Sequence, residues 1–119
     1  MEDIQKQLEI LSNKSYIFSV NTLSFVKSLQ KAGYHSGRNN KLLQLAGKLA
    51  DILLETADKT DKEEILSDLK LSEETVDTFF NLMQDIKTNG ALANEKADLH
   101  IDAFKLRKEL QTLILTFLT

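Results

Sequence analysis

Cysteine and proline are absent from this chain, and glycine occupies only four of its 119 positions. Because there is no cysteine, disulfides, thiolate nucleophiles and zinc–thiolate sites are excluded, which fits a reducing compartment. Proline and glycine both disfavour helix interiors, whereas a chain of strands would need many more turn residues than this one has. The shortage of both residues therefore predicts an all-α protein.

Long hydrophobic runs are also absent. No apolar segment approaches the roughly 20 residues that cross a bilayer, and residues 1–7 are polar and acidic, unlike a signal peptide. With 42% hydrophobic and 28% charged residues, the composition is typical of one globular domain. We therefore expect a single cytoplasmic domain covering residues 1–119, with no role in a membrane.

The net charge of −3 is unevenly distributed along the chain. Residues 1–50 contain seven Lys or Arg and three Asp or Glu, whereas residues 51–119 contain eight and fifteen. The first part is therefore basic and the rest acidic. Such a distribution favours complementary steering between the subunits of an assembly.

Apolar residues recur at spacings of three and four in four segments, which is the pattern of amphipathic helices. The first segment starts at Ile4 and is expected to end near Lys31, where Gly33 supplies a break. The second is expected to begin near Asn39 or Asn40, since either side chain can cap a helix.

The third segment follows Thr60, which forms a capping-box pattern with Glu63, and a kink near Ser72 is one interpretation of its sequence. Gly90 is a stop signal for this helix. A fourth helix is expected from Leu92 or Asn94 to the end of the chain. Short connections make neighbouring helices antiparallel, so the pattern predicts an antiparallel up-down four-helix bundle.

The residues expected to form the core come from all four segments: Phe18, Phe25, Leu49, Phe79, Met83 and Leu106. Further apolar residues widen the first and fourth stripes and are expected beside that core: Tyr16, Val20, Leu23, Val26, Ile101, Phe104 and Ile114.

The second segment carries an additional apolar stripe on a neighbouring face, made of Leu43, Gly47, Ala50, Leu54 and Ala57. A monomeric four-helix bundle needs only one apolar stripe per helix, and soluble monomers rarely expose a second one. We therefore predict that this stripe forms an oligomer interface. The alternative is a second helix that lies centrally in a monomer and is covered on both faces.

No catalytic, metal or cofactor site is expected. The two histidines, His35 and His100, are not placed by any Glu-x-x-His metal motif, and neither has a nucleophile placed by motif. Glu95, Asp98 and Asp102 share a helix face, which is typical of a solvated acidic stripe. The chain is therefore not expected to be an enzyme.

A basic cluster around the end of the first segment and the start of the second is the better candidate site. Phosphate binding by these side chains would make a nucleic-acid site, whereas the alternative is ordinary solvated cations favoured near a helix C-terminus. The candidate residues are Lys27, Lys31, Arg38, Lys41 and Lys48.

The order of these segments resembles the four-helix-bundle proteins encoded in intervening sequences of bacterial ribosomal RNA genes, and the related accessory proteins of diversity-generating retroelements. The similar features are Lys14-Ser15-Tyr16 and the segments NNKLLQLAGKLADILLETAD and EEILSDLKLSEETVDTFFNLMQDIKTNGAL, followed by a final amphipathic helix. In the second helix, Gly47 and Glu55 keep a small residue and a glutamate of the family's pattern, while its arginine and polar core are missing.

This resemblance implies a homo-oligomer, commonly a barrel-like pentamer, that binds an RNA or a reverse transcriptase. Together with the residues, it favours a non-enzymatic homo-oligomeric adaptor for a protein partner within a nucleoprotein assembly. The alternative is a direct RNA- or DNA-binding protein that uses the basic cluster.

Overall fold

The computed structural model describes the backbone of residues 2–119 and the side chains from Asp3 onward. It contains four α-helices, α1 (Glu2–Lys31), α2 (Gly37–Thr56), α3 (Lys62–Gln84) and α4 (Ala91–Leu118), and no strand in this range. The prediction of an all-α fold is confirmed.

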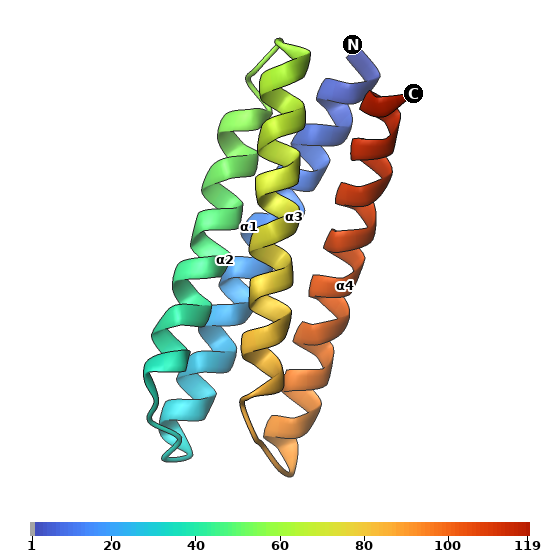
Figure 1. The fold of residues 1–119 in the computed structure, drawn as a ribbon. Coiled ribbons are helices and arrows are strands. Elements are labelled where there is room, and N and C mark those ends of the chain that lie inside the picture. Colours follow the sequence, from blue (N-terminus) through green and yellow to red (C-terminus); the bar gives the residue numbers. More distant parts are fainter. Residues whose placement is uncertain (1) are drawn as a thin grey trace.

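The helices lie side by side as a bundle with extents of 47 × 21 × 19 Å. Each helix packs against two others, so that α1 contacts α2 and α4, and α3 contacts the same two helices. Figure 1 shows the α1–α2 and α3–α4 connections at the lower end and the α2–α3 connection at the upper end. The α1–α2 connection, around which the predicted basic cluster lies in the sequence, is therefore at the lower end.

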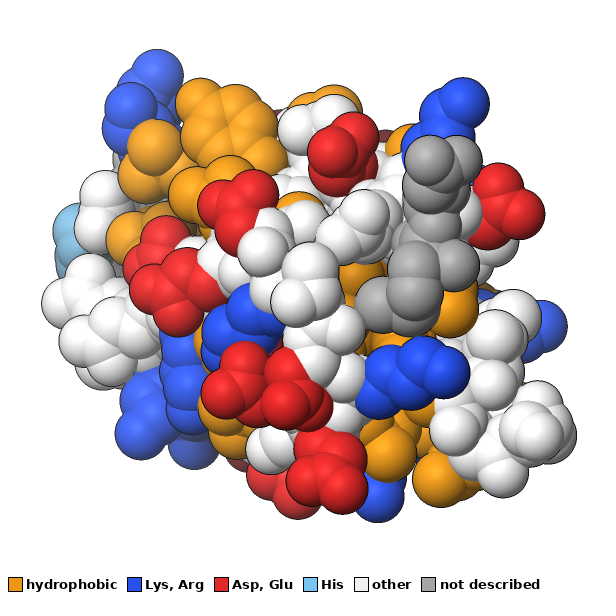
Figure 2. Space-filling view, turned by 90° about the horizontal axis from the view of Figure 1, so that it is seen from above, with side chains coloured by type: hydrophobic (Ala, Val, Ile, Leu, Met, Phe, Trp, Pro, Cys, Tyr) orange, Lys and Arg blue, Asp and Glu red, His pale blue; other side chains and the backbone are white. Residues whose placement is uncertain are grey.

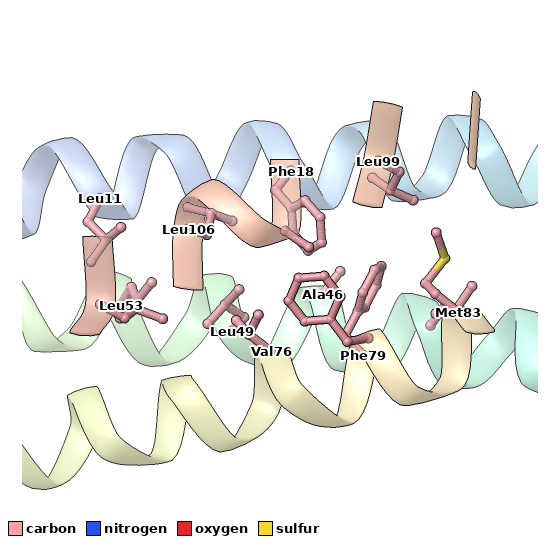
Figure 3. Packing of buried hydrophobic residues seen from close by; sticks show 14 of the residues in the cluster. Leu11, Phe18, Ala46, Leu49, Leu53, Val76, Phe79, Met83, Leu99 and Leu106 are labelled. Atoms are coloured by element: carbon pink, nitrogen blue, oxygen red, sulfur yellow. The ribbon is translucent and has the colours of Figure 1, made fainter. Parts of the chain in front are cut away.

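One apolar seam from each helix meets the others along the middle of the bundle, as expected. All six residues predicted for the core are buried, and several of them are drawn in Figure 3. The rings of Phe18 and Phe79 make an edge-to-face contact, with centroids 4.8 Å apart, between α1 and α3. All four buried phenylalanines belong to these two helices, whereas the seams of α2 and α4 contain aliphatic residues and one buried alanine each, Ala46 and Ala103.

Small hydroxyl residues interrupt the seam without leaving their polar atoms unsatisfied. Ser15, Thr22 and Ser72 are completely buried, and each hydroxyl donates a hydrogen bond of 2.8 Å to a carbonyl three or four residues earlier in its own helix. Because a buried hydroxyl is costly only when it lacks a partner, these residues can occupy core positions. The seam remains continuous through them.

The end of α1 follows the sequence closely. Gly33 has a φ of 87°, and its N–H donates to the carbonyl of Gln30 while that of Tyr34 donates to Leu29. These two bonds make a Schellman motif, in which glycine is favoured because other residues rarely adopt a positive φ. Tyr34 also packs against the core.

The expected caps of α2 and α3 were wrong by a few residues. The N-cap of α2 is Ser36, whose side chain accepts from the N–H of Arg38, whereas Asn39 is buried in the first turn and its amide donates to the carbonyl of Tyr34. The N-cap of α3 is Asp61 rather than Thr60. In both cases a neighbouring residue with an equally suitable side chain takes the cap.

The connection between α3 and α4 also differs from expectation. The third helix ends at Gln84, before the predicted stop, and Gly90 is instead the N-cap of α4 with φ 60° and ψ −136°. Few residues other than glycine adopt this conformation. Helix α3 continues through Ser72, so the structure has no break there.

The widened stripes are only partly buried. Val26 and Ile114 lie in the core as expected. The other members of these stripes are exposed, and their prediction as core neighbours was wrong: Tyr16, Val20, Leu23, Ile101 and Phe104.

Substituting the two candidate caps of α3 separates these interpretations. The carboxylate of Asp61 accepts from the N–H groups of Glu63 and Glu64, at 2.8 and 3.2 Å. We expect Asp61→Ala to lower the free energy of unfolding by about 1 kcal/mol, the usual value of a lost N-cap. Thr60→Ala, the matched control, should change it by much less. Urea denaturation of both variants measures this, and a larger loss for Thr60→Ala would contradict the assignment.

Candidate functional site

Four of the predicted basic residues lie at the lower end of the bundle. Lys27 and Lys31 belong to the last two turns of α1, and Arg38 and Lys41 to the first two turns of α2. All four are exposed, and none makes an ion pair with residues 3–119. We call these four residues the basic end.

Lys48 stands apart from this group. It lies two turns further along α2 and lines a shallow surface hollow of about 500 Å³ together with Asp51 and Glu55. The two carboxylates oppose the attraction of an anion to Lys48. The structure therefore brings four of the five predicted basic residues to one end and leaves the fifth beside acidic groups.

The second apolar stripe of α2 is partly buried except at Leu54, which is exposed. Leu43 and Ala57 pack against the core of the chain. Gly47 and Ala50 are half-buried, and the side chain of Leu54 is 63% exposed. Packing within the chain therefore accounts for only part of this stripe.

Gly47 has no packing role within its own chain. A methyl group added at this position would meet no atom within 4 Å. Glycine in a helix interior destabilises the helix by up to about 1 kcal/mol relative to alanine. Gly47 therefore lowers the stability of α2, although no helix of the same bundle comes close enough to require a glycine there.

Exposed apolar side chains of α1 lie on the flank next to α2. Lys14 and Asn21 line the groove between α1 and α4, and Tyr16 and Leu23 are each two residues further on, turned by about 200° around the helix. The helices adjacent to α1 are α2 and α4, and α1 meets α3 only across the buried core. These exposed side chains therefore lie on the α2 side. Tyr16 is 65% exposed.

Leu54 belongs to the same side of the molecule. The Thr56 hydroxyl meets Asp68 of α3, and Leu54, two residues earlier, is turned by about 160° away from it. Because α2 contacts only α1 and α3, Leu54 lies on the flank towards α1. In the end-on view of Figure 2, hydrophobic side chains gather at the upper left, where α1 and α2 lie.

We call the exposed residues of this surface the α1–α2 face: Tyr16, Val20, Leu23 and Leu54.

The sequence did contain a signal for the α1 part of this face. From Ser15 to Val26 there is no charged residue, although this stretch forms more than three turns of a helix with a solvent-facing side. Outward positions of a surface helix are normally charged or polar. Periodicity alone assigned these residues to the margin of the core, because it does not reveal how far a neighbouring helix covers the flank.

Polar groups between α3 and α4 form ordinary surface contacts. Arg107 Nε lies 3.0 Å from Asp77 Oδ1 in an ion pair, although the Nε–H is not aligned for a hydrogen bond. The His100 ring packs edge-on against Phe80, with centroids 4.7 Å apart. Among residues 3–119 no three His, Cys, Asp or Glu side chains come close enough together to hold a metal ion, and this includes those around Asp98 on α4.

A polar corner joins α2 to α3. The Thr56 hydroxyl lies 2.6 Å from the carbonyl oxygen of Ile52 and 3.0 Å from Asp68 Oδ2, so its single hydrogen serves one of them at a time. The ammonium group of Lys59 donates to the same Asp68 oxygen at 2.8 Å. This hydrogen bond raises the pKa of Lys59 above its ordinary value, and the negative charge of Asp68 adds to the effect.

No family model, curated protein or solved structure matches the chain. Within residues 2–119, none of the helices has the length and apolar character required to span a bilayer.

The shifted pKa of Lys59 predicts a pH dependence of stability. Because the folded pKa lies above the unfolded one, the ion pair stabilises the fold fully below the ordinary lysine pKa of about 10.4 and ceases to do so as pH rises through the folded value. We expect wild type to melt at a higher temperature than Lys59→Met. This difference should be constant from neutral pH up to about pH 10 and should shrink at higher pH. Thermal melts at increasing pH measure it.

Lys62→Met is the control for this experiment, since Lys62 is exposed and makes no ion pair with residues 3–119. In an Asp68→Asn background the pH dependence caused by Lys59→Met should disappear. If it persisted there, Asp68 would not be the group that stabilises the charged lysine.

Proposed function

We propose that this chain is a non-enzymatic, homo-oligomeric four-helix-bundle adaptor. Its subunits associate through the α1–α2 face, and the assembly binds a protein partner such as a reverse transcriptase or another component of a nucleoprotein assembly. The family resemblance described above favours a pentamer. The alternation of the helix connections between the two ends in Figure 1 supports the antiparallel up-down arrangement of each subunit.

The observation that carries the proposal is the uncovered apolar surface that α1 and α2 share. Fully burying a leucine-sized side chain that starts exposed contributes about 1.5–3 kcal/mol. Because these four side chains are 41–65% exposed, burying the rest of each contributes roughly half of that, which offsets part of the entropy lost on association. The backbone at Gly47 leaves space for a helix from another subunit to approach closely. Two features therefore point to the same neighbour, namely exposed apolar area and a glycine whose smallness no contact within the chain requires.

Leu54→Glu tests the α1–α2 face. Because the Leu54 side chain is already 63% exposed, this substitution should change the free energy of unfolding of an isolated subunit by no more than about 0.5 kcal/mol. At an interface, however, it would bury an uncompensated charge. We expect wild type to have the mass of an oligomer by light scattering and Leu54→Glu to have a clearly smaller mass.

Leu71→Glu is the matched control, because Leu71 is an exposed leucine on α3, outside the α1–α2 face. It should leave the mass unchanged. A wild-type protein that is monomeric at micromolar concentration would overturn the proposal. An oligomer of the same mass in wild type and Leu54→Glu would remove this face from the interface.

Direct binding of RNA or DNA is the alternative function, favoured by the basic end. Its four exposed cations have no ion-pair partner among residues 3–119 and are free to contact phosphates. Neutralising about four phosphates of a duplex makes affinity fall on the order of 100-fold between 50 and 200 mM salt. An adaptor that recognises only protein would show no salt-dependent binding of nucleic acid.

Substituting the basic end with glutamine tests this alternative. A variant with Lys27, Lys31, Arg38 and Lys41 changed to Gln should lose the salt-dependent retention of labelled RNA or duplex DNA in a mobility-shift assay at low salt. Lys48→Gln is the control and should bind as wild type does. Equal binding by wild type and the fourfold variant would exclude the basic end as a nucleic-acid site.

A further inference from the structure

The outer face of α4 carries exposed apolar side chains as well. Ile101 is 50% exposed and Phe104, three residues later on the same face, is 46% exposed. Within the chain, the Phe104 ring has the ammonium group of Lys108 over it, with Nζ 5.2 Å from the ring centroid. Ile101 lies opposite the buried seam of α4, and Phe104 lies towards α3, where its ring lines a surface hollow beside Phe80 and Gln84 and stays partly exposed.

Charges on this face are ordered by sign along the helix. Asp98 lies on the N-terminal side of the apolar pair, and Lys105 and Lys108 lie on the C-terminal side. Asp102 is not part of this surface, because it is turned by about 160° from Phe104 and lines the groove between α4 and α1. None of the three charged side chains of the surface makes an ion pair with any residue in the range 3–119. The surface therefore has an acidic end, an apolar centre and a basic end. We call it the α4 face: Asp98, Ile101, Phe104, Lys105 and Lys108.

Such a surface is complementary to a copy of itself turned end over end. If two α4 helices run antiparallel about a two-fold axis midway between residues 102 and 103, Ile101 of one copy is level with Phe104 of the other. In this pairing Asp98 of one copy is level with residue 107 of the other copy. Lys105 and Lys108 of that copy are therefore at most two residues, or about 3 Å, away along the helix axis. A parallel pairing would instead place each charge beside its own copy.

We propose that the α4 face binds the α4 face of a second copy of this chain, antiparallel and with two-fold symmetry. The contact buries Ile101 against Phe104 of the second copy and forms salt bridges from Asp98 of each copy to Lys105 and Lys108 of the other. In an interface of this type the same patch serves both subunits, so a single surface has to carry both charge signs. The sequence of charges on α4 meets that requirement.

This contact is separate from the α1–α2 face and does not depend on it, because the two surfaces share no residue. An assembly that uses both can grow beyond a single closed ring. Leu54→Glu, which is designed to break the α1–α2 face, therefore isolates the α4 contact for measurement.

Charge reversal in the Leu54→Glu background tests the pairing. One variant adds Lys105→Glu and Lys108→Glu, which makes the α4 face acidic throughout, and another adds Asp98→Lys, which makes it basic throughout. By analytical ultracentrifugation at high micromolar concentration, we expect the Leu54→Glu protein to have the mass of two chains. Each reversed variant alone should have half that mass, and an equimolar mixture of the two should return to two chains.

A variant with Lys62→Glu and Lys70→Glu in the same background is the control, since it makes the same change of net charge on exposed positions of α3. It should retain the mass of two chains. A monomeric Leu54→Glu protein would overturn the α4 proposal and leave the α1–α2 face intact. Reversed variants that remain dimeric alone, or a mixture that remains monomeric, would also overturn it.

Disulfide trapping reports the geometry directly, because the chain contains no other cysteine. In the antiparallel pairing Ile101 lies close to its own copy across the axis, so Ile101→Cys should form a disulfide-linked dimer under oxidation. Ala97 lies about 16 Å along the axis from its own copy, beyond the reach of a disulfide. Ala97→Cys, an exposed control, should stay monomeric on a denaturing gel. The reverse pattern would contradict the pairing.

Discussion

Burial of one apolar seam per helix is the constraint on which the rest of this molecule depends. A four-helix bundle of this size gains most of its stability from that seam, because the helices have few polar contacts with one another. The edge-to-face contact of Phe18 with Phe79 spans the bundle from α1 to α3. Aliphatic residues and the small Ala46 and Ala103 on the other two helices fill the remaining space. Each helix can then be covered by only two neighbours, which leaves its outer face to solvent or to another chain.

Polar groups set details that the seam cannot set. Buried hydroxyls are satisfied by carbonyls of their own helix, so most of them do not tie one helix to another. Polar contacts that do join elements occur near the ends of the bundle, where Lys59 and Thr56 meet Asp68, and along its length, where Lys14 pairs with Glu109 and Arg107 pairs with Asp77. Apolar packing can tolerate sliding along a seam, whereas these polar contacts have fixed partners. They therefore contribute to the register of the helices.

The sequence was sufficient for the helices and for the centre of the core, because spacings of three and four report directly on a buried stripe. It was less informative about helix starts. Asp61 and Thr60 are adjacent residues that both favour an N-cap, and only the path of the chain decides between them. Gly90 illustrates the same limit, since a positive φ suits the start of α4 as well as the end of α3.

The flanks of the stripes could not be assigned from periodicity. Val26 is buried whereas Leu23, three residues earlier, is exposed, because the two differ by about 60° around α1 and the neighbouring helix covers only one of them. The residues of the basic end lie close together because they stand on both sides of the short connection between α1 and α2. Lys48 was grouped with it by sequence distance alone, which ignores the acidic residues of its own helix.

The pattern of helix contacts also bears on how the chain reaches this state. Three of the four packed pairs, α1–α2, α2–α3 and α3–α4, join helices that are consecutive along the chain, and only α1–α4 joins its two ends. Contacts between consecutive helices close short loops and cost little chain entropy, so topologies of this kind fold in microseconds to milliseconds. Closure of α4 onto α1 is the step with the largest loop. Until it occurs, the apolar side chains of these two helices face water together, and this is the interval in which a growing or refolding chain is most exposed to aggregation.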